Sequence, residues 1–239
     1  MMQMWEQDMV RFMRDASEYG TYHRELAGML SPDLSAEMHV CDAGSGLGYL
    51  SLALAPYVKR VTAVERHPRA AAVLEENCRE KGVHNVVSCC GSIEDAAPAD
   101  PYDAMVFCFF GSVEEILTLA KQQCRGAVFV ITRNYTTHRF SVGQHAAGDH
   151  GYRNFREEFI RRGIPVEEDL FEVEFGQPFR TFADARSFYE IYSKDPDRGV
   201  ITDDFLREKL VETEDETFPF YLPHRRSLAL IKFRAADIP

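Results

Sequence analysis

Hydrophobic residues between positions 38 and 132 fall into two alternating kinds of run. Short runs rich in β-branched and aromatic residues are separated by longer runs whose apolar residues recur every three or four positions. The pattern predicts strands at 38–41, 61–64, 86–90, 102–109 and 127–132, and helices at 48–57, 68–81 and 113–123. Uninterrupted apolar runs at 104–107 and 127–131 favour strands buried on both faces. This alternation predicts a doubly wound α/β fold with a mostly parallel sheet and helices on both faces.

The two ends of the chain carry other patterns. Residues 2–30 show helical spacing that Gly20 interrupts, which predicts two helices. Further along we expect a helix at 152–162, a strand at 166–175, helices at 181–193 and 202–212, and a strand at 227–233. We predict three parts: an N-terminal helical segment at 1–35, an α/β domain made of 36–175 with 227–239, and an inserted helical cap at 176–226.

Composition narrows the classes of partner. The 239 residues include 38 acidic and 27 basic side chains, a formal net charge of −11, so a nucleic-acid partner is not expected. No run of about 18 apolar residues and no basic start followed by an apolar segment occur, so we expect no membrane partner and no secretory signal. Six cysteines without a CxxC pair fit thiols in a reducing compartment, which predicts a cytoplasmic location and no metal site.

A glycine-rich turn joins the first strand of the alternating region to its first helix. It has the sequence VCDAGSGLG at residues 40–48. Gly44 and Gly46 permit tight backbone geometry and close approach of a ligand. Amides at the helix start are expected to be free for a polar or anionic ligand group. Taken by itself, the motif is also compatible with a plain strand–helix turn.

The glycine spacing separates two cofactor classes. A nicotinamide oxidoreductase requires G-x-G-x-x-G, whereas this chain has G-x-G-x-G with an acid two positions earlier. The pattern D-x-G-x-G-x-G, formed by Asp42, Gly44, Gly46 and Gly48, resembles motif I of the class I S-adenosylmethionine-dependent methyltransferases. The resemblance implies a Rossmann-like, seven-stranded sheet with an antiparallel last strand, S-adenosyl-L-methionine as cofactor, and methyl transfer by in-line displacement. It also implies that Ser45, inside the motif, contacts the cofactor.

The ends of the second and third strands carry the next candidate contacts. Glu65 ends the second strand, where an acid can accept hydrogen bonds from a ribose diol. The matching acid does so in the family, so we expect Glu65 and the adjacent Arg66 at the cofactor. After the third strand, Ser92 stands where the family often has an acid beside adenine, and Ile93 is expected to offer an apolar surface to the ring.

The end of the fourth strand bears on the methyl acceptor. The resemblance places Cys108 and Phe109 near the methionine part of the cofactor and the acceptor. Amino-methylating DNA and RNA enzymes often carry (N/D)-P-P-(Y/F) here, but this chain has CFFG at 108–111. The difference argues against a nucleobase or glutamine amine and favours a small-molecule acceptor. A macromolecular (protein or RNA) methyltransferase and a non-catalytic cofactor-binding domain are the alternatives.

Two long connections converge on one edge of the predicted sheet. The strand at 166–175 is expected to be parallel and the strand at 227–233 antiparallel, so the segment 176–226 leaves and returns at the carboxyl edge. The loop at 133–152 emerges at the same edge, and long connections often form lids or binding segments. The aromatic residues of 176–226 fit a cap over a small cavity, plain packing on the sheet, or a homodimer interface.

Candidate bases for an acceptor that must lose a proton are His23 and His138. Arg133 or Arg139 is a candidate partner for an acceptor carboxylate. Histidines at 138, 145 and 150 share the loop, but their irregular spacing matches no metal-ligand pattern.

Overall fold

A seven-stranded sheet forms the centre of the protein in a computed structural model that describes residues 7–138, 140–145, 151–195 and 197–239. The strand order is β3-β2-β1-β4-β5-β10-β6. The strands are β1 (His39–Ala43), β2 (Arg60–Glu65), β3 (Val86–Cys90), β4 (Tyr102–Cys108), β5 (Cys124–Arg133), β6 (Glu167–Glu174) and β10 (Arg225–Arg234). The strands predicted at 38–41, 61–64, 86–90, 102–109, 127–132, 166–175 and 227–233 are all present, although β5 begins earlier, at Cys124.

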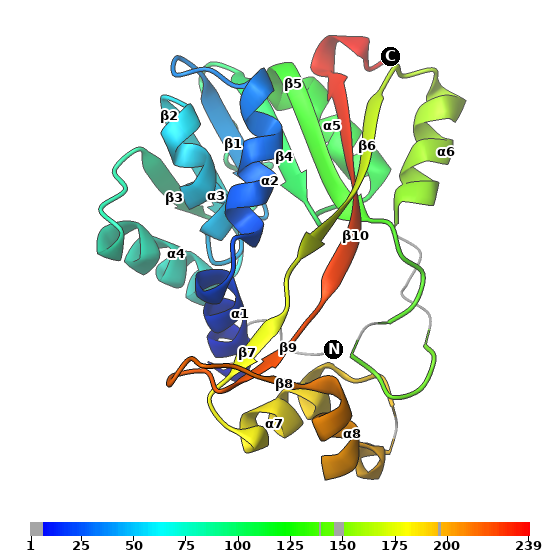
Figure 1. The fold of residues 1–239 in the computed structure, drawn as a ribbon. Helices are drawn as coiled ribbons and strands as arrows, with labels where there is room; N and C mark the ends of the chain where they lie inside the picture. The colour runs from blue at the N-terminus through cyan, green and yellow to red at the C-terminus, as the bar shows by residue number, and fades with distance from the viewer. Residues whose placement is uncertain (1–6, 139, 146–150, 196) are drawn as a thin grey trace.

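One strand of this sheet runs against the others. β10 pairs antiparallel with both β5 and β6, while the pairs from β3 to β5 are parallel. This arrangement confirms the predicted mostly parallel, doubly wound sheet with an antiparallel last strand. The carboxyl ends of the parallel strands therefore share one edge of the sheet. In Figure 1 this edge faces down, toward α7 and α8.

Helices cover both faces of the sheet because neighbouring strand residues point to opposite sides. Val106 and Phe129 pack on the face covered by α2 and α3, whereas Met105 and Val128 pack on the face covered by α5 and α6. The helices are α2 (Tyr22–Leu30), α3 (Tyr49–Leu54), α4 (Pro68–Glu80), α5 (Val113–Gln123) and α6 (Tyr152–Arg162), with 3-10 turns at Ser31–Asp33, Ala55–Tyr57 and Ala235–Asp237. The helix expected at 48–57 is thus an α-helix of one and a half turns followed by a 3-10 turn, since Pro56 follows Ala55.

The segment 176–226 forms a small unit that we call the cap. It contains α7 (Phe182–Tyr192), a 3-10 turn at Arg198–Val200, α8 (Asp203–Lys209), and strands β7 (Gln177–Phe179), β8 (Val211–Glu212) and β9 (Phe220–Leu222). The prediction of a purely helical cap, with a helix at 202–212, was wrong. The helix ends at Lys209, because the backbone at Val211 and Glu212 pairs with Tyr221 and Phe220 in the sheet β7-β9-β8.

The first helix, α1 (Gln7–Tyr19), contacts both the cap and the sheet domain (Figure 1). The Phe12 ring packs edge-on against Phe179 and Phe188 of the cap, with ring centroids 6.1 and 5.3 Å away. Arg180 of the cap donates two hydrogen bonds to the buried carboxylate of Asp15. The other end of α1 is tied to the sheet domain, since Tyr49 Oη donates to Glu18 at 2.8 Å and Arg14 pairs with Glu80 at 2.9 Å. The helix therefore bridges the two units.

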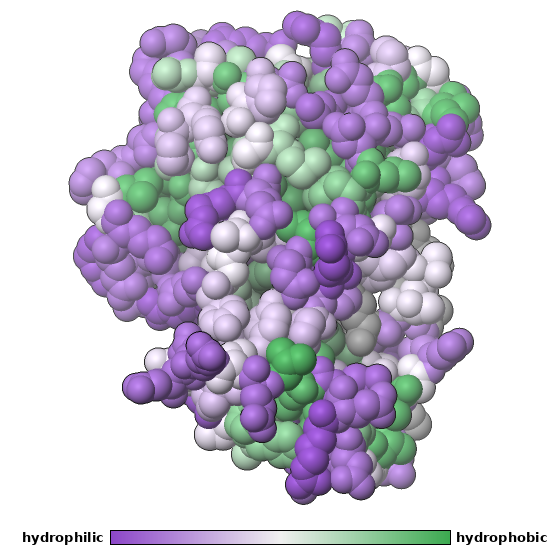
Figure 2. Space-filling model, viewed as in Figure 1, coloured by the Kyte–Doolittle hydropathy of each residue, from purple (hydrophilic) through white to green (hydrophobic). Residues whose placement is uncertain are grey.

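Hydrophilic side chains cover most of the face seen in Figure 2, and hydrophobic ones are broken into small patches. Within the described part of the chain, no helix combines the length and apolar character needed to cross a membrane.

Candidate functional site

A cavity of about 550 Å³ lies at the carboxyl edge of the sheet. Its floor comes from the ends of β1, β2 and β4, and its walls come from α1 and α2. Ten of the eleven residues expected at the cofactor line it: Asp42, Gly44, Ser45, Gly46, Glu65, Arg66, Ser92, Ile93, Cys108 and Phe109. The candidate base His23 lines it as well. The local motifs therefore meet at one place.

The glycine turn is held by hydrogen bonds within the protein. Gly44 and Gly46 adopt φ of +73° and +56°, the left-handed region that favours glycine. The amides of Gly44 and Ser45 both donate to the Val64 carbonyl at 2.9 Å, and the Gly46 amide donates to Glu65 at 3.0 Å. These three amides, which precede the start of α3, fasten the turn to β2 and are therefore not open to a ligand.

Gly48, the eleventh expected residue, lies behind the cavity wall. It has φ of +81° and precedes α3, and a Cβ there would lie 2.4 Å from Leu74 Cγ of α4. Gly48 therefore allows α3 and α4 to pack closely together, and this packing fixes the position of the glycine turn.

Glu65 is buried, with 8% of its surface exposed. Its Oε2 accepts the Gly46 amide at 3.0 Å and its Oε1 accepts the His67 amide at 2.8 Å. Two backbone donors from different sides thus fix the orientation of the carboxylate at the cavity.

Asp42 is almost fully buried at the end of β1. The Ser51 hydroxyl donates to its Oδ2. Burial is the main reason that its pKa rises from 3.8 to about 6, and the negative charge of nearby Glu65 adds to the rise. Ionised Asp42 therefore needs a cation or polar donor in the cavity to be stabilised.

The end of β4 turns sharply. Phe109 has φ of +53°, unusual for a residue with a side chain, and its amide donates to the Ile131 carbonyl at 2.9 Å. Phe110 then packs so closely against Gly44 that a Cβ on that glycine would lie 2.3 Å from the ring. This turn leaves Phe109 46% exposed beside the cavity. The strain falls where a ligand would bind, as is common at functional sites.

The end of β3 supplies one apolar and one polar group. Ile93 is buried, and Ser92 Oγ donates to Asp95 at 2.9 Å. Asp95 thus holds the serine in place from outside the cavity lining.

Several lining residues come from parts of the chain where no motif pointed to them. Met13 and Ser17 come from α1, and Phe175 and Arg226 come from the point where the cap joins the sheet. The sequence does contain an indication of Arg226. It is a charged residue at the start of an otherwise apolar strand, and the predicted neighbouring strand at 166–175 ends beside it.

Arg226 stands among aromatic rings. Its Cζ lies 4.1 Å from the centroid of Phe175, 5.2 Å from Tyr22 and 5.9 Å from Phe109. These are cation–π distances. Burial, and to a smaller extent the charge of Arg226, lowers the pKa of His23 to about 3. The His23 ring is therefore neutral at neutral pH.

Four buried polar atoms on this cavity have no hydrogen-bond partner among the described residues: Ser17 Oγ, His23 Nδ1, Ser45 Oγ and Arg226 Nε. Buried polar groups are normally paired, so such a group of atoms fits a site for a polar ligand. The volume also lies within the range of about 300–1,000 Å³ that is typical of ligand sites. The cavity therefore fits a polar molecule of cofactor size.

A second cavity, of about 260 Å³, adjoins the first. The two share Met13, Phe175 and Arg226 as lining residues. The second is closed by the loop after β5 and by the cap, and the candidate base His138 lines it. His23 and His138 therefore lie on different cavities.

The loop after β5 is fastened to the cap. Asp195 accepts hydrogen bonds from the amides of Val142 and Gly143 at 2.7 and 3.0 Å, and it pairs with His145 at 2.7 Å. Ser141 Oγ accepts the Lys194 amide at 2.8 Å. The same hydroxyl lies 3.0 Å from Nδ1 of His138. Arg139 and His150, also considered from the sequence, lie outside the described residues.

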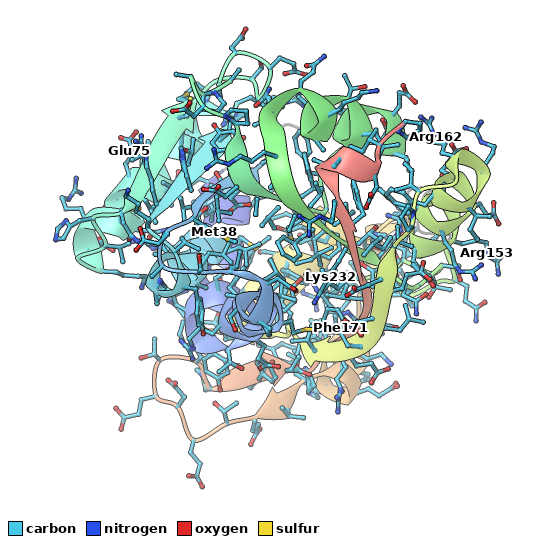
Figure 3. All side chains as sticks on the ribbon, turned by 90° about the horizontal axis from the view of Figure 1, so that it is seen from above. Met38, Glu75, Arg153, Arg162, Phe171 and Lys232 are labelled. Carbon is cyan, nitrogen blue, oxygen red and sulfur yellow. The ribbon has the colours of Figure 1, made fainter. Side chains whose placement is uncertain are left out.

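The arginines of α6 are not among the described residues that line these cavities. Arg156, Arg161 and Arg162 each pair with a carboxylate. Figure 3 shows Arg153 and Arg162 on α6 at the outer edge of the molecule, across from Glu75 of α4.

Comparison with known proteins agrees with this picture. Residues 34–143 match the sequence profile of a family described as a methyltransferase domain. No curated protein sequence matches the chain.

Solved structures of low sequence identity share the fold. The YcgJ protein of Bacillus subtilis superposes with a TM-score of 0.58 at 16% identity, over 89% of this chain and 98% of its own. Precorrin-8w decarboxylase of Methanobacterium thermoautotrophicum gives 0.52 at 19% identity over 88% of both chains. Precorrin-6y C5,15-methyltransferase of Geobacter metallireducens gives 0.51 at 14% identity over 87% of both chains.

Sheet order and glycine turn agree with the family profile, which identifies a methyltransferase domain at residues 34–143. The match supports the methyltransferase activity that motif I predicted.

Proposed function

We propose that the protein binds S-adenosylmethionine in the larger cavity and methylates a small molecule bound in the second one. The main support is the group of buried polar atoms that have no hydrogen-bond partner in the described part of the chain, on a cavity that also carries the motif residues. A non-catalytic binding domain would not need the adjoining second cavity, so its presence favours an enzyme.

The cofactor contacts follow from the chemistry of each strand end. Glu65, oriented by two backbone amides, is suited to accept the ribose hydroxyls. Asp42, buried with a raised pKa, is suited to meet the cationic amino group, which would stabilise its ionised form. Ile93 and Ser92 offer apolar and polar surface to the adenine ring.

The remaining contacts surround the reacting end of the cofactor. When bound, S-adenosylmethionine supplies an electrophilic methyl group. The resemblance places Cys108 and Phe109 there, whereas Arg66, which also lines the cavity, lies beside Glu65 at the β2 end. Apolar surroundings raise the pKa of the Cys108 thiol well above its usual range, so it stays protonated and acts by contact only.

The protein contributes mainly position and exclusion of water. Met13, Phe175 and Arg226 form the boundary between the two cavities, where acceptor and methyl donor would meet. Holding two reactants in line can lower a barrier by several kcal/mol, roughly 7–11 in favourable cases. The cap and α1 shield this boundary from solvent, which limits competing hydrolysis.

An acceptor that must lose a proton needs a base, and the two histidines differ in suitability. With a pKa of about 3, His23 is a weak base at neutral pH and fits better as a neutral hydrogen-bonding group. His138 lines the acceptor cavity, where its Nδ1 is oriented by Ser141. We assign the base role, where the acceptor requires one, to His138.

Methyl transfer can be tested by incubating the protein with S-adenosylmethionine and a panel of small acceptors, and measuring S-adenosylhomocysteine by chromatography. We expect acceptor-dependent product with the wild type and a strong loss with Glu65→Gln. Product that forms only with RNA or protein acceptors would refute the small-molecule proposal.

A further inference from the structure

The second cavity has a charge opposite to that of the protein. Its lining includes three cationic side chains, from Arg133, Lys194 and Arg226, together with His138. No aspartate or glutamate occurs among its described lining residues. In a chain with a net charge of −11, this group of cationic side chains on the described lining is a local exception that favours an anionic ligand.

Three acids stand directly beside lining residues in sequence, and each has another partner. Asp15, beside Ala16, accepts hydrogen bonds from Arg180. Glu174, beside Phe175, accepts hydrogen bonds from Tyr221 Oη at 2.7 Å and from the His224 amide at 2.8 Å. Asp195, beside Lys194, is the acceptor that fastens the loop after β5.

Arg226 keeps capacity for a ligand. Three aromatic rings hold its guanidinium, and such contacts leave its charge unneutralised. Its buried Nε has no hydrogen-bond partner among the described residues. An arginine whose guanidinium is held by aromatic rings, and whose Nε can still donate a hydrogen bond, is typical of a site for a planar anion.

The lining of the second cavity also contains aromatic rings. Phe140 and Phe188 meet edge-on with centroids 4.8 Å apart, and Phe188 and Tyr192 lie 4.6 Å apart. Burial raises the pKa of Tyr192 to about 12, so its phenol remains neutral. A flat apolar body would pack against these rings.

We propose that the methyl acceptor is a small molecule with a flat apolar body and an anionic group, a carboxylate or a phosphate. Arg133, Lys194 and Arg226 recognise the anion, and the rings of Phe140, Phe188 and Tyr192 recognise the body. This inference rests on the proposed function, since it assigns the acceptor of the same site. The volume of about 260 Å³ restricts the acceptor to a compact compound.

Direct binding tests the anion site without turnover. Benzoate, phenyl phosphate and the neutral benzamide are titrated into the protein by calorimetry, with and without saturating S-adenosylhomocysteine. We expect benzoate or phenyl phosphate to bind at least about tenfold more tightly than benzamide. Preference between the two anions distinguishes a carboxylate from a phosphate acceptor.

Variants locate the site. Arg133→Gln with Lys194→Gln should weaken anion binding at least about tenfold and leave S-adenosylhomocysteine binding unchanged, because these residues line only the second cavity. Arg133→Lys should retain binding, since it keeps the charge. The control Arg156→Gln removes an arginine of α6 that pairs with Glu168 of β6 and should change nothing.

The two proposals fail separately. Absence of S-adenosylhomocysteine binding would refute the cofactor assignment, whatever the anions do. Equal binding of benzamide and the anions, no binding of any of them, or unchanged anion binding in the Arg133→Gln and Lys194→Gln variant would refute the anionic acceptor.

Discussion

The carboxylate of Glu65 accepts the backbone amide of Gly46 at 3.0 Å, which joins the acid at the end of β2 to the glycine turn after β1. A second amide, from His67, holds the other oxygen. The residue is therefore both a link in the turn and the group aimed at the ribose. Its replacement should affect binding of the cofactor and stability together.

Glu65→Gln keeps the shape but replaces one acceptor oxygen by an NH2 group that faces a backbone donor. We expect S-adenosylhomocysteine to bind at least about tenfold more weakly, since hydrogen bonds to a charged group are worth about 1.5–3 kcal/mol. Calorimetry measures the affinity. Glu75→Gln, on the exposed face of α4, is the matched control and should bind normally (Figure 3). Equal affinity of both variants would remove Glu65 from the site.

Gly48→Ala should destabilise the fold by more than a left-handed backbone alone explains. An L-residue at φ of +81° costs about 1–2 kcal/mol, and overpacking against Leu74 adds about 1–3 kcal/mol. Gly82→Ala is the control, because Gly82 has φ of +63° but open space around a new Cβ. Urea unfolding of both variants gives the difference. The packing argument fails if the two free energies of unfolding fall equally.

Asp42 should make stability depend on pH. Its folded pKa of about 6 lies above 3.8, so the folded protein holds the proton more tightly than the unfolded chain. The stabilisation is complete below pH 4 and is lost as the pH rises through about 6. The loss amounts to about 2–3 kcal/mol. Comparison of unfolding free energies with Asp42→Asn from pH 4 to 7 isolates this effect; a difference that stays constant with pH would contradict it.

Asp195→Asn should release the loop after β5 from the cap. The charged acceptor of the Val142 and Gly143 amides becomes a neutral one that also carries donors. Hydrogen exchange of these amides should become faster, and anions should bind the second cavity more weakly, while S-adenosylhomocysteine binds as before. Asp197→Asn, which alters a turn within the cap, should leave loop exchange unchanged. Slow exchange in both variants would show that the loop is held by other contacts.

Local motifs predicted much of the fold and half of the site. Asp42, Gly44 and Glu65 could be predicted because each lies at or just after the end of a strand, where the local sequence motif is recognisable. Parallel strands then bring these ends together at one edge of the sheet. The helix–strand alternation fixed the sheet for a similar reason, since burial on both faces leaves continuous apolar runs.

Other features depend on contacts between distant segments. Met13, Phe175 and Arg226 reach the cavities only because α1 and the cap pack across the sheet edge. The strands β7, β8 and β9 have two or three residues each, too few to show a period of two. The bonded state of the Ser45 and Gly46 amides likewise depends on β2, which lies beyond the turn itself.

Titration of the purified protein with S-adenosylhomocysteine tests the cofactor site most directly. We predict one bound molecule per chain, with binding lost in Gly46→Arg, which places a long side chain in the glycine turn. No binding to the wild type, or equal binding to the wild type and Gly46→Arg, would contradict the assignment of the larger cavity.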